Sequence, residues 1–274
     1  MNFLEQMAAA SRERVHRARA GQGEAALLAA CQAAARPPRL RLADFDVIAE
    51  IKRHSPAEGV LGATVDVAGR AATYAGGGAA AVSVLTEPAR FGGSLDDLAG
   101  AVAALQPAGI PAMRKDFLVD PWQLLEARAA GAGGALLIVA MLDDILLEEM
   151  LATAAEQGLF VLLEAFDEAD LERAGRHAAG RSGPAPVLVG VNTRDLRTLA
   201  VDATRLERLA PRLPPRIPAV AESGLHTADD AARAAALGYR LALVGTALMR
   251  ASDPGGLVAD MVQAGRRLTM EPVE

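Results

Sequence analysis

Short apolar runs rich in β-forming residues recur along this chain of 274 residues, and segments with helical periodicity separate them. Their starts are spaced by about 25 to 30 residues, an alternation that predicts βαβ units and a parallel sheet. Eight such runs are present: Val47–Ile51, Ala80–Leu85, Ile110–Met113, Ala135–Val139, Phe160–Leu163, Val187–Val191, Pro218–Ala221 and Leu241–Val244. Eight strand–helix units suit a closed (β/α)8 TIM barrel, an α/β fold whose usual size is about 250 residues.

The segments outside this pattern set the expected domain organisation. Residues 1–44 contain two helical stretches, Phe3–Arg19 and Glu24–Ala35, which we expect to form an N-terminal helical extension packed on the barrel. Residues 45–270 form the expected catalytic barrel domain. A doubly wound open sheet is the alternative, but it usually has fewer strands and a glycine-rich turn after its first strand. No G-x-G-x-x-G or Walker sequence follows any of the eight runs.

Charge and cysteine content narrow the classes of partner. The formal net charge is −6, so we expect no bulk attraction to nucleic acid or to an anionic membrane, and an anionic ligand must be captured locally. Cys31 is the only cysteine, which excludes an intramolecular disulfide framework and a zinc site built on several cysteines. The four histidines are scattered, and no metal site is expected. These features predict a cytoplasmic protein.

Lysine and asparagine are rare in this chain, and their positions are informative. Of 28 basic residues only Lys52 and Lys115 are lysine, and Asn192 is the one asparagine beyond the N-terminus. A buried lysine can shift its pKa and transfer protons, whereas a guanidinium stays charged. All three residues fall at the carboxyl ends of predicted strands, where barrels of this kind place their catalytic groups.

Three glutamates also end predicted strands: Glu50, Glu164 and Glu222. We expect them to surround Lys52 and Lys115 as a compact acid–base set, in which the lysines keep the carboxylates ionised and the carboxylates keep the lysines charged. Two other interpretations are open. Each side chain could be a solvated loop residue, or the set could consist of buried ion pairs that only stabilise the barrel.

Glycines and hydroxyl residues after three strands predict a phosphate site. The loops after the seventh and eighth strands are the usual phosphate cradle of such barrels, completed by the N-terminus of a short helix. The candidates are Gly245 and Thr246 after the eighth strand, Ser223 and Gly224 after the seventh, and Ser55 after the first. Alternatively, Thr246 only caps a helix that includes residues 247–249.

Several motifs along the barrel resemble one known family. They are Ala49-Glu50-Ile51-Lys52-Arg53 with Ser55-Pro56, Ser83-Val84-Leu85-Thr86, Phe91-Gly92-Gly93-Ser94, Arg114-Lys115-Asp116-Phe117, Glu126-Ala127-Arg128-Ala129-Ala130-Gly131, Asn192-Thr193-Arg194-Asp195-Leu196, Glu222-Ser223-Gly224 and Val244-Gly245-Thr246-Ala247-Leu248-Met249. Together they are highly specific, and the chain resembles the indole-3-glycerol-phosphate synthases of tryptophan biosynthesis. The N-terminal extension also fits that family.

The resemblance implies a carbon–carbon lyase that acts on a phosphorylated small molecule without a cofactor. The implied reaction closes 1-(2-carboxyphenylamino)-1-deoxyribulose 5-phosphate to indole-3-glycerol phosphate, with loss of carbon dioxide and water. In such enzymes the lysine matching Lys115 is the general acid. Glu164 matches a catalytic carboxylate, and Glu50 with Lys52 matches a pair that acts in later proton transfers and dehydration.

The resemblance also assigns residues that bind the substrate. Asn192 and Glu222 would hold the emerging hydroxyl and the amine, and Arg194 with Ser223 would orient the anthranilate ring and its carboxylate. Phe91 and Phe117 would line the aromatic pocket. The phosphate would be bound by Ser55, Gly224, Gly245 and Thr246.

The sequence departs from the family pattern at a few positions: Ala57 and Glu58 after Ser55-Pro56, Arg90 before Phe91, and Phe166 after Glu164. We expect these changes to affect phosphate affinity and the shape of the aromatic pocket. They leave open a paralogue that acts on a substituted anthranilate adduct. Further alternatives are phosphoribosylanthranilate isomerase and a non-catalytic barrel that binds a phosphorylated ligand or a partner protein. The expected assembly is a monomer or a weak homo-oligomer.

Overall fold

The computed structural model describes residues 1–55, 59–62, 65–181, 183 and 185–270. Eight parallel strands close a barrel in the order β1-β10-β9-β8-β7-β6-β5-β4, which confirms the predicted (β/α)8 architecture. The barrel strands are β1 (Asp46–Ile51), β4 (Ala81–Leu85), β5 (Ala112–Lys115), β6 (Gly134–Ile138), β7 (Phe160–Ala165), β8 (Val187–Asn192), β9 (Ala219–Glu222) and β10 (Leu241–Val244). The short strands β2 (His54–Ser55) and β3 (Gly59–Val60) pair antiparallel beside it.

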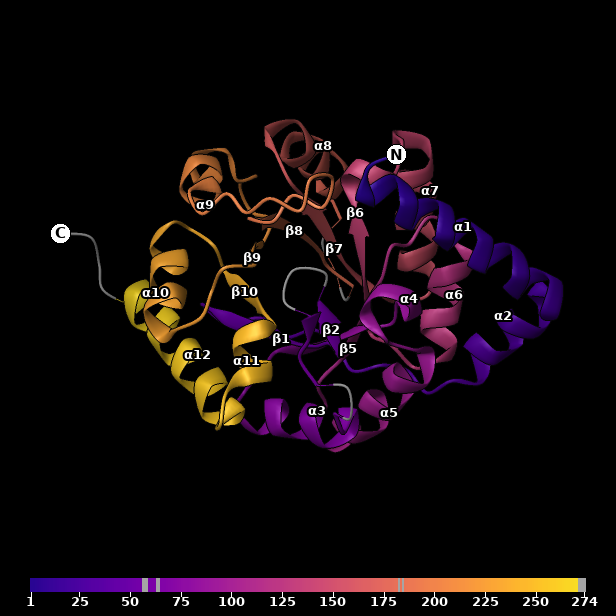
Figure 1. Cartoon of the computed structure of the whole chain (residues 1–274), viewed down its shortest axis with the longest axis horizontal. Coiled ribbons are helices and arrows are strands. Elements are labelled where there is room, and N and C mark those ends of the chain that lie inside the picture. The colour runs from indigo at the N-terminus through magenta and orange to yellow at the C-terminus, as the bar shows by residue number, and fades with distance from the viewer. Residues whose placement is uncertain (56–58, 63–64, 182, 184, 271–274) are drawn as a thin grey trace.

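Helices surround the strands (Figure 1). The α-helices are α1 (Phe3–Gly21), α2 (Glu24–Ala33), α3 (Val67–Gly76), α4 (Pro88–Phe91), α5 (Leu95–Leu105), α6 (Trp122–Ala129), α7 (Asp144–Glu156), α8 (Glu168–Ala178), α9 (Arg205–Leu209), α10 (Ala228–Ala236), α11 (Thr246–Arg250) and α12 (Pro254–Met270). Three 3-10 helices are η1 (Gln106–Ala108), η2 (Val139–Met141) and η3 (Ala210–Arg212). Asp143, Asp167 and Thr227 are the N-caps of α7, α8 and α10, and each accepts a backbone N–H at the start of its helix.

The third strand begins later than the sequence pattern predicts. We expect a strand over Ile110–Met113, whereas β5 runs from Ala112 to Lys115. Pro111 has no N–H to donate to a ladder, which favours the later start. The strand continues through two charged residues because their side chains find polar partners on the two faces of the sheet.

Alternation along the strands separates two apolar layers. In β1, Val47 and Ala49 pack in the cluster between the strands and the outer helices, and Ile48 packs in the cluster inside the barrel. The inner cluster also contains Met113, Phe160 and other inward residues, so the barrel is filled below the strand ends. Glu50, two residues after Ile48, therefore points inward above this filled core.

The N-terminal helices pack directly on the barrel. Leu4 and Met7 of α1 join the inner cluster, and Val15, Leu27 and Cys31 form a smaller cluster with α6. Figure 1 shows α1 and α2 in indigo beside α6. The packing is in line with the predicted extension, while its domain boundary at residue 44 stays a prediction. Within the described ranges, no helix is both long and apolar enough to cross a membrane.

Candidate active site

A pocket of about 310 Å³ opens at the carboxyl ends of the strands. Every residue that the sequence and the family resemblance single out for the site borders this pocket: Glu50, Lys52, Ser55, Phe91, Lys115, Phe117, Glu164, Asn192, Arg194, Glu222, Ser223, Gly224, Gly245 and Thr246. The barrel brings these residues together because the carboxyl ends of parallel strands meet at one rim.

The lysines and glutamates form one cluster. Lys115 Nζ lies 3.0 Å from Glu164 Oε2, 3.5 Å from Glu222 Oε2 and 4.0 Å from Glu50 Oε2. Lys52 Nζ lies 2.7 Å from Glu50 Oε1. The three carboxylates are almost completely buried, and both ammonium groups keep some exposure to the pocket. The lysines and glutamates of the predicted set therefore lie together at the pocket, with their carboxylates buried.

Mutual attraction sets the charge of two of these groups. Burial opposes the ammonium form of Lys115, but Glu164, Glu222 and Glu50 overcome this effect and raise its pKa. Burial also opposes the carboxylate form of Glu50, and the charges of Lys52 and Lys115 outweigh that effect and lower its pKa. Lys115 is thus a charged donor that faces the pocket.

Glu222 does not follow the expectation that the lysines keep all three carboxylates ionised. Burial raises the pKa of Glu222 well above its ordinary value, and the adjacent Glu164 adds to the shift by its charge and a hydrogen bond. The attraction of Lys115 is too weak to reverse this because one ammonium is shared among three carboxylates. The direction of this pKa shift differs from the expectation that the lysines favour the ionised form of all three carboxylates.

Two glycines make room for the carboxylates. A Cβ atom at Gly245 would collide with Glu50 Oε1 and would lie 3.0 Å from Lys52 Nζ, while a Cβ atom at Gly190 would collide with Glu222 Oε1. Side chains at either position would push the acid–base cluster apart. The motif glycine after β10 is thus required by the cluster as well as by any ligand.

Hydrogen bonds within the segment after β8 occupy two of the acceptor groups of Asn192. Its Oδ1 accepts the backbone N–H of Arg194 at 2.9 Å, and its backbone carbonyl accepts a hydrogen bond from Arg205 Nη1 at 2.7 Å. This turn holds Asn192 at the rim and leaves its amide nitrogen as the group that can serve a ligand. Arg194 follows on the same turn and borders the pocket.

The predicted phosphate end is built from backbone turns. Ser223 and Gly224 have φ values of 65° and 75°, so two successive residues are left-handed directly after β9. Such strain in a non-glycine residue is typical of functional sites. Gly245 is the N-cap of α11 and Thr246 its first residue, so the alternative that Thr246 is the helix cap is wrong. Pro56, Ala57 and Glu58 lie outside the described residues.

Aromatic rings form one wall of the pocket. Phe91 ends α4 and Phe117 follows β5, and their ring centroids are 6.0 Å apart. Phe3 from α1 packs edge-on against Phe117, with centroids 5.9 Å apart. The N-terminal extension therefore supports the aromatic wall, although Phe3 itself is absent from the pocket lining.

Sequence reasoning missed the apolar lining. The pocket is also bordered by Leu85, Leu136, Ile138, Leu196, Leu199, Val201, Leu225 and Leu243. The inward positions on β6 could have been found from the period-two alternation of the strand. The residues from the loop after β8 carry no comparable signal because an irregular loop has no period.

Two departures from the family pattern do not border the pocket, contrary to our expectation. Arg90 is exposed on α4, and it contributes its backbone N–H to the α4 cap. Phe166 is fully buried in the inner cluster, where the Arg197 guanidinium lies 5.6 Å from its ring centroid. Arg90 is exposed away from the pocket lining and Phe166 is covered by neighbouring chain, so neither borders the pocket.

The comparisons with known proteins agree with this geometry. Residues 4–261 match the family model described as indole-3-glycerol phosphate synthase. A relative of that name from a Nocardioides species is 49% identical over 224 residues, which is 82% of each chain. A relative from Streptomyces coelicolor with the same activity in its name is 47% identical, over 80% of this chain and 78% of its own. Another, from Mycobacterium avium, is 44% identical, over 86% of this chain and 85% of its own.

Solved structures support the fold at low sequence identity. A thiamine phosphate pyrophosphorylase from Pyrococcus furiosus has a TM-score of 0.58 at 16% identity and covers 82% of this chain and 96% of its own. A 3-hexulose-6-phosphate synthase from Salmonella typhimurium has a TM-score of 0.58 at 12% identity and covers 81% of this chain and 99% of its own. These similarities concern the barrel alone. On the family match and the identity of its relatives, the chain belongs to the indole-3-glycerol phosphate synthase family.

Proposed function

We propose that the chain closes the indole ring of 1-(2-carboxyphenylamino)-1-deoxyribulose 5-phosphate to form indole-3-glycerol phosphate, with release of carbon dioxide and water. The observation that carries this function is Lys115, a charged ammonium 3.0 Å from Glu164 in a pocket bordered by aromatic rings and by hydroxyl residues. That arrangement suits a substrate with a ring at one end and a phosphate at the other.

Lys115 is the proposed general acid of the ring closure. The ring carbon that bears the carboxylate attacks the ketone carbon, and Lys115 protonates the ketone oxygen as negative charge develops on it. Loss of carbon dioxide then returns the bonding electrons to the ring. The neighbouring carboxylates stabilise the ammonium before transfer, and Glu164, 3.0 Å from Lys115 Nζ, holds it in place.

Dehydration requires a second set of proton transfers. The hydroxyl formed from the ketone leaves as water once it is protonated, and the CH2 carbon next to the nitrogen loses a proton, so that the double bond of the indole ring forms and the nitrogen keeps its hydrogen. Lys52 and Glu50, which are ion-paired at 2.7 Å, are proposed for these steps. Asn192 and Glu222 would hold the hydroxyl and the amine, and Asn192 has its amide nitrogen available for this.

The remaining residues are proposed to bind the two ends of the substrate. Phe91 and Phe117 contact the ring, and Arg194 and Ser223 orient the ring carboxylate. The phosphate is assigned to the opposite end: Ser55, Gly224, Gly245 and Thr246. Backbone N–H groups of turns and a local hydroxyl provide an anion site that does not need a net positive protein.

The decisive experiment is turnover of the carboxyphenylamino substrate by the purified protein, followed by the fluorescence of the indole product. Lys115→Met is the chemical control because it removes the ammonium at similar length. Arg233→Met is the matched control, since Arg233 pairs with Glu207 on the surface and lies outside the pocket. We expect turnover by the native protein and by Arg233→Met but not by Lys115→Met.

Incubation of the same protein with phosphoribosylanthranilate, and a measurement of ligand binding, separate the alternative functions. Consumption of phosphoribosylanthranilate in place of this substrate would identify an isomerase. Binding without turnover would identify a non-catalytic barrel. Either outcome contradicts the proposed function.

We also infer that the chain acts in the cytoplasm as a monomer or a weak homo-oligomer. An internal supply of phosphorylated substrate and the single, buried Cys31 support this setting. Sedimentation velocity over a range of protein concentrations tests the assembly, and a stable larger species would contradict it.

A further inference from the structure

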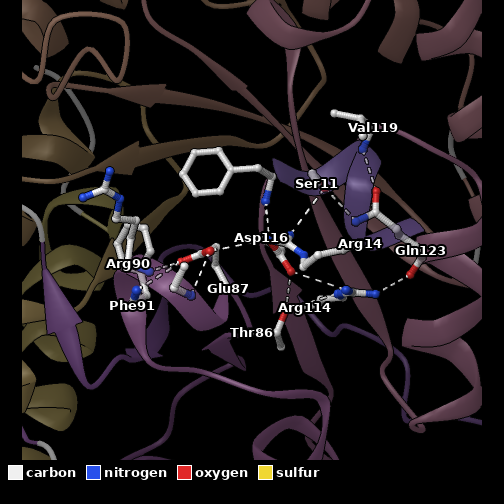
Figure 2. A network of polar contacts seen from close by, with 12 residues as sticks. Ser11, Arg14, Thr86, Glu87, Arg90, Phe91, Arg114, Asp116, Val119 and Gln123 are labelled. Atoms are coloured by element: carbon white, nitrogen blue, oxygen red, sulfur yellow. Dashed lines mark hydrogen bonds and ion pairs between the residues drawn. The ribbon is translucent and has the colours of Figure 1, made fainter. Parts of the chain in front are cut away.

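One arginine of the N-terminal helix α1 joins two buried carboxylates of the barrel (Figure 2). Arg14 Nη2 donates to Asp116 Oδ1 at 2.6 Å, and Arg14 Nη1 donates to Glu87 Oε1 at 3.4 Å. The side chains of Glu87 and Asp116 are 0% and 1% exposed. These carboxylates lie in the segments after β4 and after β5, so Arg14 bridges two neighbouring loops at the rim of the pocket.

Each carboxylate holds the backbone of one pocket phenylalanine. Glu87 is the N-cap of α4 and accepts the N–H groups of Ala89, Arg90 and Phe91, the last at 3.1 Å. Asp116 Oδ1 accepts the N–H of Phe117 at 2.8 Å. Arg14 is therefore connected to the backbone of each of the two phenylalanines by two hydrogen bonds in series.

A second contact from α1 extends the brace. Gln123 Nε2 donates to Ser11 Oγ at 2.9 Å, and Gln123 Oε1 accepts the N–H of Val119 at 2.8 Å. Ser11 also accepts a hydrogen bond from Arg14. The segment after Phe117 is thus tied to the same turn of α1.

Electrostatics explains why a cation between these two loops is favourable. Two buried carboxylates on adjacent loops repel each other and require charged or hydrogen-bonding partners. Arg114 pairs with Asp116 from within β5 at 3.3 Å, but among the described residues Arg14 is the cation recorded as an ion-pair partner of Glu87. Removal of Arg14 would leave Glu87 without that charge and would loosen the α4 cap.

We propose that Arg14 is a positioning residue that sets the separation and orientation of Phe91 and Phe117 and thereby the affinity for the aromatic ring of the substrate. This role rests on the proposed function. Arg14 does not line the pocket, so it acts through Glu87 and Asp116. The acid–base cluster is held by contacts within the barrel and is expected to keep its geometry when Arg14 is changed.

The test compares Arg14→Met with Arg19→Met. Arg19 is on the same helix and also forms an ion pair with the barrel, to Asp120 at 2.7 Å. It stacks on Trp122 and has no hydrogen bond to Glu87 or Asp116 among the described contacts. We expect Arg14→Met to raise KM by about tenfold to a hundredfold, the range for loss of charge-assisted hydrogen bonds, and to leave kcat within about threefold. Arg14→Lys should restore part of the affinity, and Arg19→Met should leave KM unchanged.

Inorganic phosphate supplies a readout for the opposite end of the pocket. Its inhibition constant should be the same in Arg14→Met and in the native protein, because the proposed phosphate cradle is formed by other loops. If KM and this constant rise together, or if KM stays unchanged, the positioning role is wrong. If Arg14→Met fails to fold, Glu87→Gln removes the same ion pair while it keeps an acceptor for the α4 N–H groups, and it should raise KM in the same direction.

A reduced analogue of the substrate, with an alcohol in place of the ketone, separates this proposal from the function itself. Calorimetry measures its binding without any chemistry. Weaker binding to Arg14→Met than to Arg19→Met supports the positioning role, and equal binding contradicts it. Lack of turnover by the native protein would contradict the proposed function, whereas the calorimetric comparison would still give its own result.

Discussion

The acid–base cluster and the aromatic wall of the pocket are held in place by different parts of the chain. At the charged end, Glu50, Lys115, Glu164 and Glu222 are on barrel strands, and their ion pairs are formed within the barrel. At the aromatic end, Phe91 and Phe117 lie outside the strands and are supported by α1 through Phe3 and Arg14. The reacting groups are thus fixed by the sheet, and the ring-binding groups depend on an added helix.

We therefore expect kcat and the affinity for the aromatic ring of the substrate to respond to changes in separate parts of the chain. Strands hydrogen-bonded on both sides resist displacement, so the proton-transfer geometry is protected from changes in the extension. A loop tied by a few side-chain hydrogen bonds shifts more easily. The following predictions test this separation, from the largest effect to the smallest.

Lys115→Arg should have the largest effect, at the charged end. Arginine keeps the charge that Glu164 and Glu222 require but removes the transferable proton, so kcat should fall by a factor on the order of 10² to 10⁴. Steady-state turnover with the carboxyphenylamino substrate measures this, and binding of the reduced analogue shows that the pocket is intact. More than half of the native kcat in the variant would rule out Lys115 as the general acid.

Thr246→Asp should weaken binding at the phosphate cradle. The new carboxylate would face the proposed phosphate, and like charges at close range should raise KM by roughly tenfold or more. The melting temperature serves as the control, because a change at the first position of the short helix α11 should leave the barrel stable. An unchanged KM would mean that Thr246 does not contact the phosphate.

Glu222→Gln should change the pH dependence of stability. Because burial raises the pKa of Glu222 in the folded chain above its ordinary value of 4.5, the folded state holds a proton that the unfolded state releases above that pH. The stabilisation is therefore complete below about pH 4.5 and is lost as pH rises toward the folded pKa, by at most about 1.4 kcal/mol per pH unit.

The glutamine variant lacks this titration. Its free energy of unfolding relative to the native protein should therefore increase as pH rises, and urea unfolding at several pH values between 4.5 and 8 measures the difference. A difference that is independent of pH would show that Glu222 titrates normally in the folded chain.

The double variant Arg90→Phe, Phe166→His should have the smallest effect. Neither side chain borders the pocket, so the variant and the native protein should rank unsubstituted and ring-substituted substrates alike, within about threefold in relative kcat/KM. A change of about 10- to 200-fold would revive the alternative of a paralogue with a modified ring pocket. Arg90 in particular retains its backbone role in the α4 cap with any side chain.

The sequence by itself determined the barrel and the members of the site. The spacing of apolar runs predicts the eight strands because each βαβ unit repeats a short alternating or buried pattern, and N-cap residues such as Asp143 and Thr227 mark helix starts through local hydrogen bonds. The position of Lys52, Lys115 and the three glutamates at strand ends then places them at one rim, since all strands of the barrel point the same way.

Only the tertiary structure decided how those groups affect one another. Burial and the charge of Glu164, which is on a different strand, raise the pKa of Glu222, and Phe166 is buried in the inner cluster with the Arg197 guanidinium from another loop 5.6 Å from its ring centroid. Arg14 meets Glu87 and Asp116 across 73 and 102 residues of sequence. Strand patterns and caps depend on neighbours along the chain, whereas charge state, exposure and bracing depend on distances between segments that only the folded barrel brings together.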